Sequence, residues 1–117
     1  MSVEDVIAQL DSHSEVLESH VLLREIKMEL DIGEYQPLIK IKIYKSSLVK
    51  GNPYHFEVSH HVHTPEQMSP YFPSRTSFSS EKEAIDKAIT STTSCLKDAI
   101  NKGNNPEDEW LIENENF

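Results

Sequence analysis

Regular alternation of apolar and polar residues in three successive segments is the feature that most constrains the fold of this chain. Residues 24–32, 39–44 and 54–63 place apolar side chains at every second position, with mostly charged or histidine side chains between them. Successive side chains on a β-strand point to opposite faces, so the pattern predicts three strands with one apolar face each. Gly33 and the turn sequence 51–53 separate them, which favours an antiparallel meander.

Helical periodicity replaces this alternation on both sides of the three strands. Ser2 is a suitable N-cap for a helix over residues 3–18, in which apolar side chains recur at helical spacing. The sequence Ser80-Glu-Lys-Glu83 has the pattern of a capping box, and the apolar stripe behind it ends at Gly103.

The element order is therefore α-β-β-β-α. It predicts an α+β fold in two layers, a three-stranded antiparallel meander with two helices on one face. We expect residues 1–103 to form this single α+β domain and residues 104–117 to form an acidic C-terminal tail, either docked on the domain or free.

The same order resembles that of double-stranded-RNA-binding domains. Residues 76–88, reading TSFSSEKEAIDKA, also resemble the start of the last helix in that family. The family carries a lysine cluster at this helix start, whereas here three acidic residues surround Lys82 and Lys87. The resemblance therefore implies a fold and does not extend to RNA binding.

Negative charge is concentrated at the two ends of the chain. The net charge of the 117 residues is −9, and residues 1–20 and 104–117 each contain five acidic residues and no lysine or arginine. Such ends repel phosphate backbones, which excludes free nucleic acid as a partner, and they attract basic protein surfaces. The lone Cys95 and the absence of a signal peptide or apolar membrane segment predict a soluble cytoplasmic protein with no membrane partner.

Histidines on the third strand suggest one form of chemistry. His61 and His63 are two residues apart and so share a strand face, on which His55 and Glu57 also lie. Imidazole and carboxylate groups are ligands for Zn²⁺, so a metal-binding protein or metal-dependent enzyme is the alternative hypothesis. A polar strand face without a ligand, or a surface that senses pH through its histidines, explains the same residues.

Apolar side chains in two polar segments predict a protein-binding surface. Trp110, Leu111 and Ile112 interrupt the acidic tail, and Tyr71 and Phe72 lie in the proline-rich loop after the third strand. The tail triplet must pack either on its own domain, for instance as an extra edge strand, or on a partner.

No nucleophile motif or phosphate-binding loop is present in the sequence. We therefore expect a small, acidic, non-catalytic interaction or regulatory domain with no cofactor. Its partner would be a protein, in one form a basic protein that handles nucleic acid. An open edge of the predicted sheet also offers a surface for a homodimer.

Overall fold

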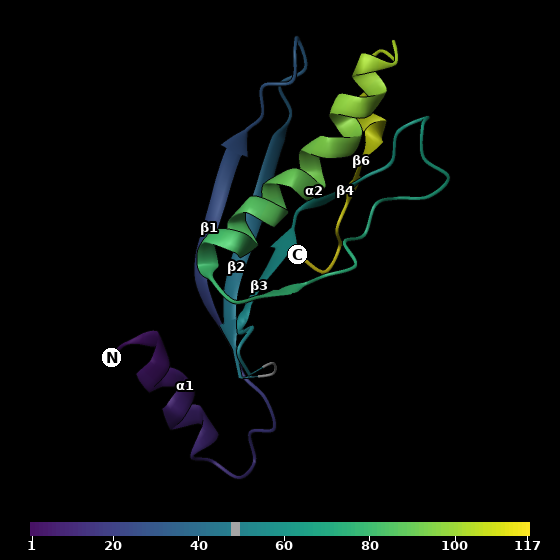
Figure 1. The fold of residues 1–117 in the computed structure, drawn as a ribbon. Helices are drawn as coiled ribbons and strands as arrows, with labels where there is room; N and C mark the ends of the chain where they lie inside the picture. Colours follow the sequence, from purple (N-terminus) through teal and green to yellow (C-terminus); the bar gives the residue numbers. More distant parts are fainter. Residues whose placement is uncertain (48–49) are drawn as a thin grey trace.

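An antiparallel sheet with a long helix across one face forms the body of the protein, as a computed structural model shows for residues 1–47 and 50–117 (Figure 1). The predicted α+β meander is confirmed: β1, β2 and β3 are neighbours in the order β1-β2-β3-β5, and a separate ribbon pairs β4 with β6. The elements in chain order are α1 (Val3–Asp11), β1 (His20–Glu29), β2 (Leu38–Ser46), β3 (Tyr54–Val58), β4 (His60–Val62), β5 (Ser77–Phe78), α2 (Glu81–Asn101), the 3-10 helix η1 (Asp108–Trp110) and β6 (Leu111–Glu113).

The β1–β2 hairpin sets the register of the sheet. Ile32 and Tyr35 exchange backbone hydrogen bonds of 2.9 and 3.1 Å around the two-residue turn. Gly33 has a φ of 67° there, in the left-handed region that glycine enters without steric cost. The resulting register places Ile26 opposite Ile41 and Glu25 opposite Lys42. Apolar side chains thus share one face of the sheet and charged side chains the other.

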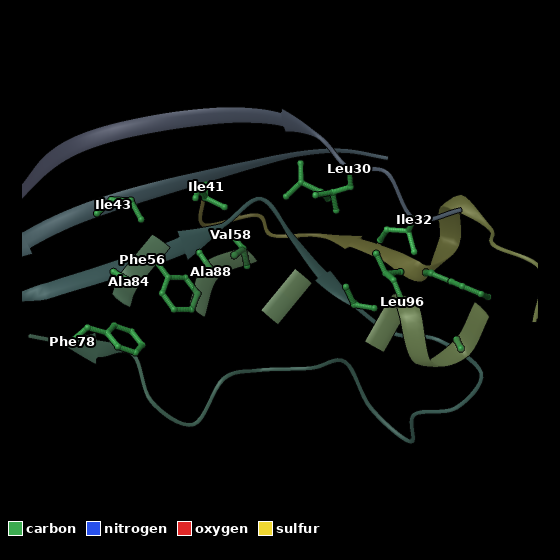
Figure 2. Close-up of a cluster of buried hydrophobic side chains, with 14 residues drawn as sticks. Leu30, Ile32, Ile41, Ile43, Phe56, Val58, Phe78, Ala84, Ala88 and Leu96 are labelled. Carbon is green, nitrogen blue, oxygen red and sulfur yellow. The ribbon is translucent and has the colours of Figure 1, made fainter. Parts of the chain in front are cut away.

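The core lies between the apolar face of the sheet and α2 (Figure 2). Helix α2 crosses this face and contacts β2, β3, β4 and β5. Side chains with no exposed surface come from both layers: Ile39, Ile41, Ile43, Ala84, Ala88, Leu96 and Ala99. The small alanines let the helix approach the isoleucines of β2 closely, which gives the dense packing that protein cores require.

Helix α2 remains continuous through a run of threonines and serines with low helix propensity. The hydroxyls of Ser91, Thr92 and Thr93 are buried, and each donates to a backbone carbonyl three or four residues earlier, at 2.9–3.3 Å. These bonds satisfy polar groups that would otherwise be costly to bury. The Ser80 hydroxyl caps the helix as predicted, whereas the Glu83 carboxylate bonds to Ser79.

Helix α1 is shorter than predicted and lies apart from α2. It ends at Asp11 instead of residue 18, although Ser2 and Asp5 form the expected cap. It lies near the start of β1, where none of its residues is buried and Glu4 forms an ion pair with Lys45 of β2 (Figure 1). Its apolar side chains are only half-buried, so packing does little to extend the helix beyond Asp11, where Ser12, His13 and Ser14 favour a turn.

The C-terminal segment is docked on the domain. Strand β6 pairs antiparallel with β4, so that His61 is opposite Ile112 and Val62 opposite Leu111. The third predicted strand divides into β3 and β4 at Ser59, whose hydroxyl accepts the Lys40 amide and whose carbonyl accepts the Asn114 amide. Ser59 therefore ends the pairing with β2 and begins the pairing with the tail.

Candidate protein-binding site

The outward face of the β4–β6 ribbon carries a small apolar patch, which we call the ribbon patch and define as His61, Phe72 and Ile112. His61 and Ile112 are opposite each other across the ribbon, and the rings of His61 and Phe72 lie 4.4 Å apart between centroids. Phe72 is 64% exposed and Ile112 is 40% exposed. An exposed aromatic ring and an exposed isoleucine that both neighbour His61 give this surface apolar area that a protein partner could cover.

The loop that carries Phe72 is fixed by hydrogen bonds to the ribbon. The Tyr71 amide donates to the Val62 carbonyl at 2.8 Å. The Gln67 side-chain amide donates to the same carbonyl at 3.0 Å, and its oxygen accepts the Thr64 amide at 2.8 Å. Phe72 is therefore presented from an ordered support, which reduces the entropy that binding would otherwise cost.

The C-terminal segment that carries Ile112 is rich in carboxylates. Residues 107–109, just before β6, are acidic, Glu113 follows Ile112, and Glu115 lies two residues further on. Within the described parts of the chain, none of these five carboxylates takes part in an ion pair. The result is an apolar anchor on a segment of net negative charge, which suits a basic partner surface.

The other three residues predicted to bind a partner are more buried than Phe72 and Ile112. Trp110 is only 4% exposed and lies edge-on to the Tyr35 ring, with centroids 6.5 Å apart. Leu111 packs against the same core, and Tyr71 is half-buried. The tail triplet therefore divides, with Trp110 and Leu111 facing the core and Ile112 facing outward. The sequence predicted Ile112 and Phe72 as partner-binding residues. It predicted His61 as a metal ligand, whereas in the structure His61 neighbours both of them.

The residues predicted to bind metal are not brought together. His55 and Glu57 belong to β3, whereas His61 and His63 lie beyond the break at Ser59, in or next to β4. The His61 ring contacts the Phe72 ring at a tilt of 42°, and the His63 ring is hydrogen-bonded to the Gln67 carbonyl at 3.2 Å. Across residues 1–47 and 50–117, no three histidine, cysteine or acidic side chains are grouped as metal ligands would be. The predicted shared face ends at Ser59, so the geometry gives the metal hypothesis no support.

His55 is held on the sheet face that α2 leaves uncovered. Its Nε2 lies 2.7 Å from the Ser46 hydroxyl, and its ring is edge-on to that of His20, with centroids 6.0 Å apart. Burial lowers the pKa of His55 below its ordinary value of 6.5, and the charge of nearby His20 lowers it further, against a backbone hydrogen bond to Thr76. The folded protein therefore favours neutral His55.

Acidification is expected to destabilise the protein through His55. Because the pKa is lower in the folded state, the unfolded chain binds the proton first. The free energy of unfolding should then decrease as the pH falls from about 6.5 through the folded-state pKa. Urea titrations between about pH 8 and pH 5 measure the slope of the free energy of unfolding against pH. The slope should be shallower in His55→Gln and unchanged in the exposed control His13→Gln. Equal slopes in all three proteins would contradict the role of His55.

Cys95 does not have the surroundings of a reactive thiol. It is half-buried on α2, and burial, followed by the charge of Asp98, raises its pKa. A raised pKa disfavours the thiolate, which is the nucleophilic form. The half-buried thiol packs against the core, and its protonated form is favoured.

Comparisons with protein-family models, curated proteins and solved structures find no match to this chain. Function must therefore be inferred from its own residues. Among the described residues, no helix is long and apolar enough to cross a membrane.

Proposed function

We propose that this protein is a non-catalytic interaction module that binds a protein partner through the ribbon patch. The single observation that carries the proposal is the exposure of Phe72 and Ile112 on a hydrogen-bonded support in an acidic segment of the protein. The partner surface would have an apolar recess for the Phe72 ring, surrounded by lysine or arginine. A basic protein that handles nucleic acid is one partner of this kind, and with Cys95 as a free thiol we place the interaction in the cytoplasm.

The chemistry of the patch divides the binding energy between two sources. Phe72 and Ile112 supply apolar area that is removed from water on contact, and such central anchors carry most of the affinity in protein interfaces. The carboxylates of residues 107–109, 113 and 115 supply long-range attraction, which mainly raises the association rate and weakens with salt. Binding should therefore be salt-sensitive in rate and Phe72-dependent in affinity.

Replacement of Phe72 by alanine tests this proposal. Affinity capture from cells of the natural source, followed by reconstitution with the purified partner, gives a dissociation constant by titration calorimetry. We expect Phe72→Ala to weaken binding by about 30-fold or more, as for an interface hot spot. Ile112→Ala should weaken it less.

Leu17→Ala is the matched control, because Leu17 is 97% exposed and lies between α1 and β1, away from the ribbon patch. It should bind like the wild-type protein. Unchanged binding by Phe72→Ala, with the fold intact by circular dichroism, would overturn the proposal. Stoichiometric Zn²⁺ in protein purified without a tag, lost in His61→Ala with His63→Ala, would instead favour the metal hypothesis.

A further inference from the structure

Strand β1 forms an unpaired edge of the sheet. It is ten residues long, and within the described residues it pairs only with β2 (Figure 1). The Leu30 amide donates to the Pro37 carbonyl at 2.8 Å, which shows that even-numbered positions here direct their peptide groups toward β2. The N–H and C=O groups of Glu25, Lys27 and Glu29 consequently point away from the sheet and remain available to another strand.

The apolar side of β1 is also incompletely covered. Leu23, Ile26 and Met28 contact the core but are only half-buried, because α2 packs mainly over the strands beyond β1. Natural edge strands are usually protected by proline, short length, bulges or charged side chains. The register shift between Leu22 and Arg24 interrupts the start of β1, whereas from Glu25 to Glu29 the strand is regular and its charged side chains lie on the polar face alone.

We propose that a second copy of this chain pairs with β1, antiparallel and about a two-fold axis at Ile26. In this register Glu25 is opposite the partner's Lys27, and Lys27 is opposite the partner's Glu25. Ile26 is opposite the partner's Ile26 on the apolar side. The two four-stranded sheets then join into one continuous sheet, and the surface joined is distinct from the ribbon patch.

The charge order of β1 favours an axis at Ile26 over an axis at Lys27. Glu25, Lys27 and Glu29 alternate in sign on one face, so a two-fold axis at Ile26 makes two attractive cross-strand pairs. An axis at Lys27 would instead place Lys27 opposite the partner's Lys27 and Glu25 opposite the partner's Glu29. Like charges directly opposite each other are destabilising, so that register is disfavoured.

Backbone geometry is consistent with the axis at Ile26. In an antiparallel pair, opposite residues are either both hydrogen-bonded or both not. Glu25 and Lys27 both direct their peptide groups outward, so they form hydrogen-bonded pairs. Ile26 directs its peptide groups toward β2 and falls at a non-hydrogen-bonded position, where side chains approach most closely. The two Ile26 side chains thus cover the half-buried apolar side of each edge.

Charge exchange on β1 tests the dimer and its register together. Sedimentation equilibrium over a concentration series gives the dimer dissociation constant. Lys27→Glu leaves three acids at alternate positions on one face of β1. It should raise the dimer dissociation constant by about 10- to 100-fold, because both attractive pairs become repulsive. Glu25→Lys should do the same. The double variant Glu25→Lys with Lys27→Glu restores opposite charges and should return the constant to near the wild-type value.

Three observations would overturn the proposal: a wild-type protein that stays monomeric, a Lys27→Glu protein that dimerises like wild type, or a double variant that fails to recover. Lys97→Glu, with the same charge change on an exposed position of α2, is the control and should leave the constant unchanged. Lys27 is opposite Lys40 within the chain, so Lys27→Glu removes a like-charge pair and does not threaten the fold. Partner capture through Phe72 should be retained in Lys27→Glu, which separates the two surfaces.

Discussion

Replacement of Trp110 by alanine is expected to lower the free energy of unfolding by about 3–5 kcal/mol, as large-to-small changes of buried aromatic residues do. Trp110 is 4% exposed and packs edge-on against Tyr35, so its removal loses apolar burial and leaves a cavity. Its carbonyl accepts the His63 amide at 2.8 Å, which ties the tail to β4. The loss is a large share of the roughly 5–15 kcal/mol that stabilises a typical domain.

Urea unfolding followed by circular dichroism measures this loss. Phe72→Ala is the matched control, because it removes an aromatic ring that is 64% exposed and should change the free energy of unfolding by no more than about 0.5 kcal/mol. Removing residues 104–117 should destabilise the protein at least as much as Trp110→Ala. A truncated chain as stable as the full one would show that the tail does not contribute to the stability of the domain.

Replacement of Leu96 by alanine is expected to cost about 2–5 kcal/mol of stability. Leu96 has no exposed surface and belongs to the core cluster between α2 and the sheet. Neighbouring side chains are held by the α2 backbone and the paired strands, so they can refill the lost volume only in part.

The same substitution at Leu17 provides the comparison for Leu96. Leu17 is 97% exposed, so Leu17→Ala removes no buried methyl groups and should shift the free energy of unfolding by no more than about 0.5 kcal/mol. Chemical denaturation of the two variants isolates burial as the cause, since both change leucine to alanine. Similar losses at both positions would contradict the packing of α2 on the sheet.

Patterns of period two and the Ser80 cap predicted the meander and α2 because both rest on local rules. The β2 residues Ile39, Ile41 and Ile43 alternate with lysines, and each isoleucine is fully buried as the pattern requires. The predicted length of α1 was wrong. An amphipathic pattern extends a helix only where the apolar face can pack against a core. Leu17 fits the helical spacing but has nothing to pack against.

Residues that meet only through long-range pairing could not be placed from sequence. The alternation through residues 54–63 reads as one strand, and the break at Ser59 exists because β4 leaves β2 to pair with β6. That break separates His55 and Glu57 from His61 and His63, so the predicted shared face is lost. The ribbon patch likewise joins Phe72 and Ile112, forty residues apart in sequence, through His61.

Docking of the tail has a consequence for the order in which the protein folds. Strands β1, β2 and β3 pair with sequence neighbours across short connections, so the meander closes small loops at low entropic cost. Pairing of His60 with Glu113, in contrast, closes a loop that spans α2 and all of its preceding connection. The meander can therefore form early, while the last part of the core stays open until Trp110 arrives. Throughout that interval the part of the core that Trp110 completes is exposed to water, and the protein is most vulnerable to misassociation.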